Sequence, residues 1–478
     1  MSVRVRIAPS PTGLIHVGNV RSALFNWLFA RHHRGTFIVR IDDTDVERSL
    51  REYEDDILDG FRWLGLDWDE GVEVGGPHGS YRQSDRFDRY QEVAHDFVDR
   101  GLAYHDDRSP EQLEELRSRA QAEKRHPNFY IRRPTEIARG GAIRFSVPQD
   151  AAIVFEDTVR DAMRFEPETV DDFVILRSDG IPTYHLASTV DDVDYEISHV
   201  IRGEDLLPST PKHILLSRAL GANPPVYAHL PLLFGPDGKK LSKRHGDTSL
   251  TAYRRGGYLP EAMVNFMSLL GWSLDSERTM FSRDEAVAAF DLGRVSKNPA
   301  IFDVEKLAWL NGEYIRALAP AEFIKMVMPY VEASLRRTLD DSELVQFSTI
   351  APLVQERTKL LTEAPEQVLW LFSDVLGYDG DSWAKVMVEG SAEVLTVAAG
   401  RLEEVIDWDA GSIEGVLRAM LDDLSINART GLQPLRVAVT GSSVSPPLFE
   451  SMAVLGRRRT IDRLRAAIER IGAASHPR

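Results

Sequence analysis

Apolar and polar positions change period several times in the first forty residues. Residues 3–8 alternate apolar and charged side chains, which is the period of a strand. A turn with two prolines and a glycine follows, and apolar side chains then recur about every 3.6 positions over residues 19–33, which predicts a helix. A short apolar run covers residues 37–41. Strand, loop, helix and strand in this order predict a βαβ unit of a parallel sheet.

A second unit of the same kind is predicted far downstream. Residues 199–202 have the pattern of a strand end, and Ser209-Thr210-Pro211 predicts a helix start with a capping hydroxyl and a proline in the first turn. Residues 229–234 form another apolar run, and the turn sequence Gly-Pro-Asp-Gly follows it. We therefore expect one α/β domain that the intervening residues split into two halves.

The intervening segment and the C-terminal half differ in character from this domain. The intervening segment has a charged helical pattern at residues 110–124 and strand-like runs at residues 142–147 and 173–176. After residue 253 the pattern is almost wholly that of amphipathic helices. The predicted fold is an α/β domain with a parallel sheet, split by an α/β insertion and followed by an all-α C-terminal half.

Composition narrows the class of protein. The chain has 478 residues, 43% of them hydrophobic, and at roughly 150 residues per domain it should form about three domains. The absence of cysteine excludes disulfides, thiolate nucleophiles and cysteine zinc sites. No apolar run has the length of a signal peptide core or a membrane helix. We expect a cytoplasmic protein.

The charge of the chain is distributed unevenly. The formal net charge is -17, which by itself argues against a polyanionic ligand. However, residues 1–40 carry six arginines and no acidic residue, and residues 239–255 carry six lysines and arginines against one aspartate. Residues 436–478 carry eight arginines against three acidic residues. The first two segments suit phosphates, and the third is a plausible RNA-facing strip, although a solvated helix face would have the same pattern.

Each of the first two basic segments contains a candidate phosphate site. The stretch HVGN places His16 and Gly18 at a predicted helix N-terminus, where free backbone N–H groups and the helix dipole favour an anion. Gly18 would admit a nucleotide close to the backbone, and His16 could donate to a phosphoryl oxygen. In the stretch KLSKR, Lys240 and Lys243 could neutralise a leaving pyrophosphate. Considered separately, the two stretches are better explained as a capped turn and a solvated loop.

Considered together, HVGN and KLSKR resemble the HIGH and KMSKS signatures of class I aminoacyl-tRNA synthetases, in the expected order and each after a predicted strand. Longer stretches resemble the glutamyl-tRNA synthetases of bacteria over essentially the whole chain. These stretches are RIAPSPTG at residues 6–13, RIDDTD at 40–45, GGP at 75–77, YRQS at 81–84, PTYHLA at 182–187, VIRGED at 200–205 and LFE at 448–450.

The resemblance implies a glutamate–tRNA ligase. Such an enzyme activates L-glutamate with ATP to glutamyl-adenylate and transfers the glutamyl group to the 3'-terminal ribose of tRNA(Glu), with tRNA(Gln) as an alternative acceptor. ATP is a substrate, and Mg²⁺ is expected with it, although no isolated acidic cluster indicates the Mg²⁺ ligands. The resemblance favours a monomer with no membrane partner. Many relatives carry a cysteine-rich zinc site, and since this chain has no cysteine, we expect no zinc.

The resemblance also implies a division into domains. A Rossmann-like catalytic domain is expected at residues 1–95 and 186–252, with an inserted acceptor-binding domain at 96–185. A helical domain that contacts the tRNA stem is expected at 253–318. Helical anticodon-binding domains are expected at 319–374 and 375–478.

Site residues follow from the same resemblance. Asp42 stands where the family normally has Glu, so its contact with the substrate ammonium could require a water, and Ser188 stands where many relatives have Asn. The residues expected to bind glutamate are Arg6, Asp42, Tyr184, Ser188 and Arg202. Those expected to bind ATP are Ala8, Ser10, His16, Gly18, Glu204, Lys240 and Lys243, of which His16, Gly18, Lys240 and Lys243 are the expected catalytic residues. Arg357 is expected to read the last anticodon base.

Three alternatives remain at this point. A smaller nucleotidyl-transfer enzyme would share the HIGH-like turn but lack the large helical half. A glutaminyl-type synthetase is a closer alternative, although the sequence of residues 8–13, APSPTG, favours the glutamyl type. A catalytically silent RNA-binding paralogue would be expected to lose phosphate-contacting groups, yet His16, Lys240 and Lys243 are present.

Overall fold

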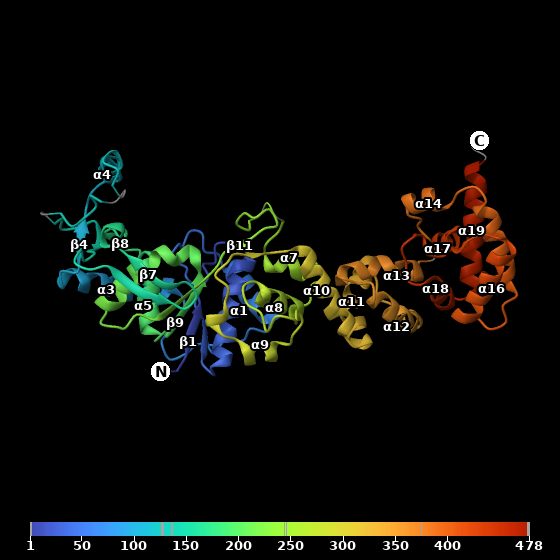
Figure 1. The fold of residues 1–478 in the computed structure, drawn as a ribbon, viewed down its shortest axis with the longest axis horizontal. Helices are drawn as coiled ribbons and strands as arrows, with labels where there is room; N and C mark the ends of the chain where they lie inside the picture. The colour runs from blue at the N-terminus through green and yellow to red at the C-terminus, as the bar shows by residue number, and fades with distance from the viewer. Residues whose placement is uncertain are drawn as a thin grey trace. The chain divides into compact units, whose positions relative to one another are not determined.

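The chain forms two compact units. The computed structural model describes residues 2–125, 129–134, 137–242, 244, 246–373 and 375–475, with residues 474 and 475 as backbone only. One unit consists of Met1–Arg255 with Pro260–Leu307, and the other of Gly256–Leu259 with Ala308–Arg478 (Figure 1). Each unit is described by itself below.

Parallel strands form the centre of the first unit. Strand β1 (Arg4–Ile7) lies parallel to β2 (Thr36–Val39), which lies parallel to the short β3 (Glu70–Gly71). Strand β9 (His199–Gly203) lies parallel to β10 (Val226–Leu230). The N–H of Ser198 donates to the carbonyl of Arg4 at 3.0 Å, so β1 and β9 lie side by side. The two halves predicted from the sequence therefore meet at these two strands.

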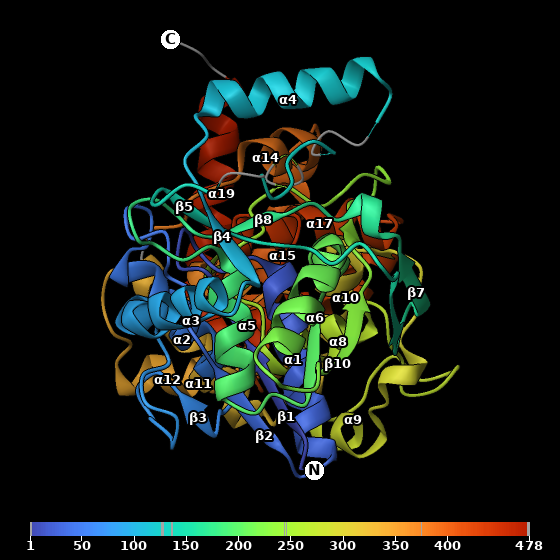
Figure 2. The same ribbon diagram turned by 90° about the vertical axis from the view of Figure 1, so that its left-hand side faces the viewer.

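Helices cover this sheet. Helix α1 (Val17–His32) packs against β1, β9 and the helices α8 (Pro260–Leu269) and α9 (Arg283–Ala289). Because it is enclosed by these elements, 12 of its 16 residues are buried. Helices α5 (Tyr184–Asp194) and α6 (Thr210–Ala219) lie side by side (Figure 2).

The inserted segment contributes two kinds of sheet. Strands β4 (Ala103–Asp106), β5 (Ala142–Phe145) and β8 (Phe173–Leu176) form an antiparallel sheet. Strands β6 (Ile153–Asp157) and β7 (Asp161–Phe165) form a hairpin. The end of β6 pairs with β10 through Asp157 and Tyr227, so the insertion extends the central sheet instead of standing apart from it.

The other regular elements of the first unit surround these sheets. They are α2 (Arg51–Leu64), α3 (Phe87–Asp99), α4 (Pro110–Ala122), α7 (Leu250–Arg255), β11 (Leu233–Phe234) and β12 (Ala300–Ile301).

The second unit is helical throughout its described residues. Helix α10 (Val304–Ala317) begins in the first unit and continues into the second. The following helices are α11 (Pro320–Leu335), α12 (Asp341–Gln355), α13 (Ala364–Phe372), α14 (Gly380–Val386), α15 (Ser391–Glu403), α16 (Ala410–Asp423), α17 (Ala428–Thr440), α18 (Leu448–Leu455) and α19 (Arg457–Ser475). No helix in the described part of the chain combines the length and apolarity that crossing a membrane requires.

The predicted fold class is confirmed. The structure has parallel strands from both halves, an α/β insertion between them and a helical C-terminal half. The finer division into five parts stays a prediction. One local prediction was wrong, because the Ser209 side chain makes no capping hydrogen bond to α6. The neighbouring Thr210 hydroxyl instead accepts a hydrogen bond from Arg202 at 2.9 Å.

Candidate functional site

A cavity of about 670 Å³ lies at the carboxyl ends of β1 and β9, beside the N-terminus of α1. This edge of a parallel sheet is the usual place for a ligand in α/β folds. Most residues singled out in the sequence line this cavity, although they come from segments far apart in the chain. They are Arg6, Ala8, Ser10, His16, Gly18, Asp42, Tyr184, Ser188, Arg202 and Lys240.

Two of the expected site residues, Glu204 and Arg357, are placed differently. Glu204 follows β9 directly, but its carboxylate accepts from the N–H of Leu232 at 2.8 Å and pairs with Arg160. Lys243 lies outside the described residues. Arg357 belongs to the second unit.

His16 is the N-cap of α1, and its Nδ1 accepts from the N–H of Gly18 at 3.0 Å. Burial, together with the charge of Lys240, lowers the pKa of His16, so the ring is neutral at pH 7. With Nδ1 as acceptor, the remaining proton is on Nε2. A Cβ at Gly18 would lie 3.2 Å from His16 Nδ1, so the glycine also leaves room for this ring. The capping and phosphate-donor interpretations of His16 are therefore compatible.

Lys240 lines the cavity and follows the turn after β11, where its backbone forms a bridge to Phe234. Its Nζ is 3.5 Å from Asp205 Oδ2, and both side chains are exposed. An exposed pair of this kind is weak, so the lysine can exchange its partner for a phosphate at little cost.

A buried ionic layer lies behind the amino-acid side of the cavity. Arg6 donates through Nε and a terminal nitrogen to Asp192 at 3.0 and 3.1 Å, and Arg40 donates to the same carboxylate at 2.8 Å. Arg40 also donates to Asp42 at 2.7 Å and to Ser188 at 3.1 Å. One guanidinium therefore contacts both Asp42 and Ser188, the two positions expected from the sequence to depart from the family pattern.

The acidic run at residues 42–45 divides among separate partners. Asp42 is bound by Arg40, while the Asp43 carboxylate accepts from Ser84 Oγ at 2.6 Å. Asp45 accepts from Arg48 Nε at 2.7 Å. The three carboxylates therefore have separate partners and do not converge on one point.

Arg202 has a different environment from Arg6. Its terminal nitrogens donate to the Tyr184 hydroxyl at 3.0 Å and to the Leu206 carbonyl at 3.2 Å, and its Nε faces His229 Nε2 at 3.2 Å. These acceptors are all uncharged.

Sequence reasoning missed three residues around the cavity. Arg40 and Asp192 form the ionic layer, and Arg21 lines the cavity itself. Arg21 donates to the carbonyls of Leu270, at 3.2 Å, and Pro231, and burial lowers its pKa to about 10. For Arg21, the sequence did contain a signal: a charged residue stands at a position that the helical pattern predicts to be buried.

In the second unit, Arg357 lies in the turn after α12 and is exposed. It donates to the Ser445 carbonyl at 2.7 Å, and Arg436 donates to the Ser445 hydroxyl at 2.6 Å. Burial, followed by the charge of Arg357, lowers the pKa of Arg436. Two cations thus meet at one loop, which suits an anionic or carbonyl-rich ligand.

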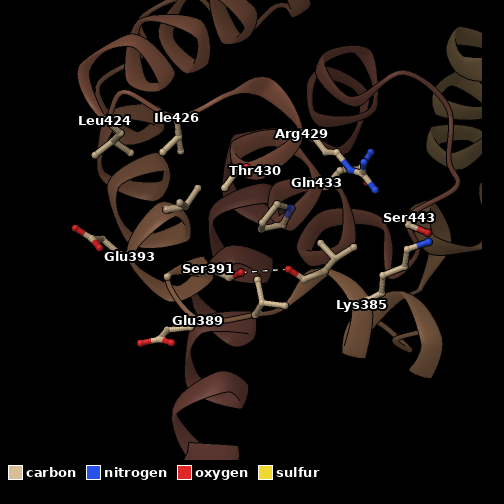
Figure 3. A pocket seen from close by; sticks show the side chains of 15 residues that line it. Lys385, Glu389, Ser391, Glu393, Leu424, Ile426, Arg429, Thr430, Gln433 and Ser443 are labelled. Carbon is tan, nitrogen blue, oxygen red and sulfur yellow. Dashed lines mark hydrogen bonds between the residues drawn. The ribbon is translucent and has the colours of Figure 1, made fainter.

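The second unit also contains a cavity of about 600 Å³ between α14, α15 and α17. Figure 3 shows Glu389 and Glu393 on one side of it and Lys385 and Arg429 on the other. Ser391 Oγ donates to the Val386 carbonyl at 3.2 Å within the same wall. None of the residues expected from the sequence lines this cavity.

The chain resembles known proteins along nearly its whole length. Residues 2–309 match the family described as "tRNA synthetases class I (E and Q), catalytic domain", and residues 322–468 match "Anticodon binding domain". The glutamate–tRNA ligase of Dehalococcoides mccartyi is 46% identical over 476 residues, which cover 98% of each chain. That of Streptomyces coelicolor is 44% identical over 491 aligned positions, again covering 98% of each chain.

Solved structures are similar as well. A glutamate tRNA ligase of Elizabethkingia meningosepticum, crystallised in complex with its amino acid, superposes with a TM-score of 0.85 at 32% identity. The match covers 98% of this chain and 99% of the other.

Proposed function

The chain belongs to the class I tRNA synthetases of the glutamate and glutamine group, and we propose on this basis how its residues join glutamate to tRNA. Its function is that of a glutamate–tRNA ligase, the activity named for relatives that match it from end to end. The observation that supports the residue assignment is one cavity that combines a helix N-terminus, a lysine and three arginines.

In the first step, an α-carboxylate oxygen of glutamate attacks the α-phosphorus of ATP, and the bond to the bridging oxygen breaks to release pyrophosphate. Mg²⁺ enters with ATP as part of this substrate. His16 donates its Nε2 proton in a hydrogen bond to a phosphoryl oxygen as negative charge develops there. Lys240 and Lys243 neutralise the departing pyrophosphate. The protein thus supplies position and charge and forms no covalent intermediate.

Glutamate occupies the side of the cavity that Arg6, Tyr184 and Arg202 line. Arg202 is the stronger carboxylate partner, because Asp192 already offsets the charge of Arg6. Asp42 is tied to Arg40, so it contacts the substrate ammonium through a water, and Ser188 helps to hold Arg40 in place.

In the second step, a hydroxyl of the 3'-terminal ribose attacks the activated carbonyl of glutamyl-adenylate, and AMP leaves. The inserted segment holds the acceptor end, and the helical unit binds the anticodon. Arg357 reads the last anticodon base, supported by its exposure and by the neighbouring Arg436.

Pyrophosphate exchange tests the first step. We expect exchange with glutamate and little with glutamine, measured with and without tRNA(Glu), because the resemblance suggests that activation needs tRNA. Exchange that depends on glutamine instead would support a glutaminyl-type enzyme. No exchange with either amino acid in the presence of tRNA would support the silent paralogue.

Charging of purified transcripts tests the tRNA partner. We expect tRNA(Glu) to be charged, and the rate with tRNA(Gln) decides whether it is a second substrate. Arg357→Ala should lower charging of tRNA(Glu), with Arg34→Ala, an exposed arginine of the first unit, as the matched control. Equal losses in both variants would contradict the role of Arg357.

A further inference from the structure

Arg202 differs from the other arginines of the amino-acid site in how its charge is balanced. Arg6 and Arg40 each contact the Asp192 carboxylate. Among the described residues, Arg202 has no carboxylate within ion-pair distance, although only 4% of its surface is exposed. A buried guanidinium without a counter-ion is costly unless its N–H groups are fully used. The arrangement of its acceptors therefore indicates which N–H groups are left for a ligand.

The acceptors of Arg202 fall into an inner and an outer group. The inner group consists of His229 Nε2, 3.2 Å from Nε, the Thr210 hydroxyl, 2.9 Å from one terminal nitrogen, and His213 Nδ1, 3.4 Å from the other. The Thr210 hydroxyl also lies 3.1 Å from His229 Nε2. All three residues are buried. The outer group consists of the Tyr184 hydroxyl and the Leu206 carbonyl, and both residues line the cavity. The inner contacts can persist when a ligand enters, whereas the outer ones lie where a carboxylate would bind.

His229 is held on its other side by Asp157. Its Nδ1 lies 2.5 Å from Asp157 Oδ2, and its main-chain N–H donates to Oδ1 of the same carboxylate at 3.2 Å. Two further N–H groups, of Val159 and Arg160, donate to Oδ1 at 3.0 and 2.8 Å. The carboxylate is thus fixed by the turn that ends β6, in the inserted segment.

These contacts define the tautomer of His229. Burial alone would raise the pKa of Asp157, but the hydrogen bonds from His229 and the main chain bring it below its ordinary value. Burial lowers the pKa of His229, and the charge of Arg202 adds to this effect. The carboxylate is therefore ionised and accepts the proton of a neutral ring at Nδ1, which leaves Nε2 as an acceptor for Arg202.

We propose that His229, fixed by Asp157, is a positioning residue that orients Arg202 toward the substrate carboxylate without neutralising it. A carboxylate in the place of His229 would orient Arg202 equally well but would cancel the charge needed for the substrate. The imidazole ring separates Asp157 from Arg202 and supplies a neutral acceptor. This inference rests on the proposed function, since it assigns the carboxylate to glutamate.

Two substitutions of His229 distinguish its hydrogen bond with Arg202 from its hydrogen bond with Asp157. In His229→Gln, the amide oxygen can occupy the position of Nε2 and still accept from Arg202. In His229→Asn, the shorter amide can still donate to Asp157 but leaves Arg202 Nε without its acceptor. We expect His229→Asn to raise KM for glutamate about 10- to 100-fold, the loss of one hydrogen bond to a charged group. KM for His229→Gln should stay within about threefold of the unchanged protein.

The measurement is pyrophosphate exchange in the presence of tRNA(Glu), with glutamate and ATP varied separately. KM for ATP and kcat at saturating glutamate should change less than about threefold, because the ring does not contact ATP. The control is His95→Asn, an exposed residue of α3. Equal KM values for glutamate in His229→Gln and His229→Asn, or a parallel rise in KM for ATP, would overturn the inference.

A further variant covers the case in which the histidine substitutions fail to fold. Thr210→Val nearly preserves the volume and removes a second inner acceptor of Arg202. It should raise KM for glutamate several-fold, and an unchanged KM would contradict the inference. If the unchanged protein shows no glutamate-dependent exchange, the proposed function fails. If it is active but the variants do not differ as described, only the role of His229 fails.

Discussion

At the scale of single residues, the buried ionic layer is the feature with the largest energetic consequences. Asp192 bridges Arg6 and Arg40, and Arg40 is completely buried. Burial alone would raise the pKa of Asp192, but the two arginines bring it below its ordinary value. Each charge in such a layer is costly to bury and is offset only while its partner is present. The layer therefore fixes the Arg6 side chain at the cavity wall.

Asp192→Asn should destabilise the protein strongly, because it leaves two buried guanidinium groups short of a counter-charge. We expect a loss of about 3–5 kcal/mol in the free energy of unfolding of the first unit, measured by urea denaturation. The control is Asp59→Asn in α2, which removes an exposed pair with Arg62 and should cost less than about 1 kcal/mol. Similar losses in both variants would contradict the importance of the buried layer.

Asp191 should make the stability of the protein decrease as the pH rises, which is the opposite of the usual effect of a paired aspartate. Burial raises its pKa to about 6, although Arg40 and Arg86 oppose the rise. The folded state therefore binds this proton more tightly than the unfolded state, whose aspartates titrate near 3.8. The resulting stabilisation is complete below about pH 4 and is lost as the pH rises to about 6.

We expect the free energy of unfolding of the unchanged protein, relative to Asp191→Asn, to decrease between about pH 4 and 6 and then to level off. Urea denaturation of both proteins across this range measures the difference. Asp59→Asn serves as a reference, because its exposed carboxylate should give a nearly flat difference. A difference that increases with pH would show that Asp191 has the opposite shift.

At the scale of elements, the N-terminus of α1 combines a structural cap with the proposed hydrogen-bond donor to the phosphate. His16 caps the helix through Nδ1 and keeps a proton on Nε2 for the cavity. One residue therefore has two separable tasks. Asparagine is a good N-cap but is too short to reproduce Nε2, whereas glutamine can reproduce the Nε2 position but caps poorly.

His16→Asn should keep stability within about 0.5 kcal/mol and lower adenylate formation by at least about 100-fold, the effect of losing one donor to developing charge. His16→Gln should lose about 1 kcal/mol of stability and retain more of the activity. Thermal unfolding and single-turnover adenylate formation measure the two effects. If both variants lose activity equally and neither loses stability, the division of tasks is wrong.

Helix α19 shows how a basic pattern can mislead. Its arginines suggested an RNA-facing strip, yet Arg463 is buried and donates to the carbonyls of Val439 and Ser373 at 2.6 and 2.9 Å. Arg459 also donates to Ser373 at 3.0 Å. Ser373 is the C-cap of α13, and Val439 is in the last turn of α17, where cations are favourable. These two arginines hold the helical unit together.

At the scale of the whole molecule, the net charge of -17 coexists with a reaction on phosphates. We expect the acidic excess to limit indiscriminate binding of RNA, while the basic residues are concentrated where phosphates are expected. At the cavity, the cations are Arg6, Arg21, Arg202 and Lys240.

Chelation should distinguish Mg²⁺ that is bound with ATP from a structural metal that stabilises the fold. Treatment with EDTA should abolish pyrophosphate exchange and leave the thermal unfolding temperature unchanged, and Mg²⁺ alone should restore exchange. Elemental analysis should find no stoichiometric zinc. A fall of several degrees in the unfolding temperature on chelation, or activity restored only by zinc, would indicate a structural metal.

The fold class and most of the residues around the cavity could be predicted because their signals are local. Strand periodicity, the turn at residues 9–13 and the two basic stretches are contiguous in the chain, so their chemistry is visible without a structure. The capping of α6 was predicted wrongly because a 3-10 helix, Glu204–Ser209, continues directly into α6. Ser209 therefore has helical backbone angles (φ -83°, ψ -18°) instead of the extended ones that an N-cap residue needs.

The family and the reaction follow from the amino-acid sequence alone, and the segments that meet ATP and glutamate are predicted from it. Which arginine has its charge offset by a carboxylate depends on the fold. Asp192 stands 186 positions from Arg6, and Asp157 stands 72 positions from His229. Whether a guanidinium is neutralised or left available depends on which distant groups the fold buries beside it, and burial strengthens every such pairing.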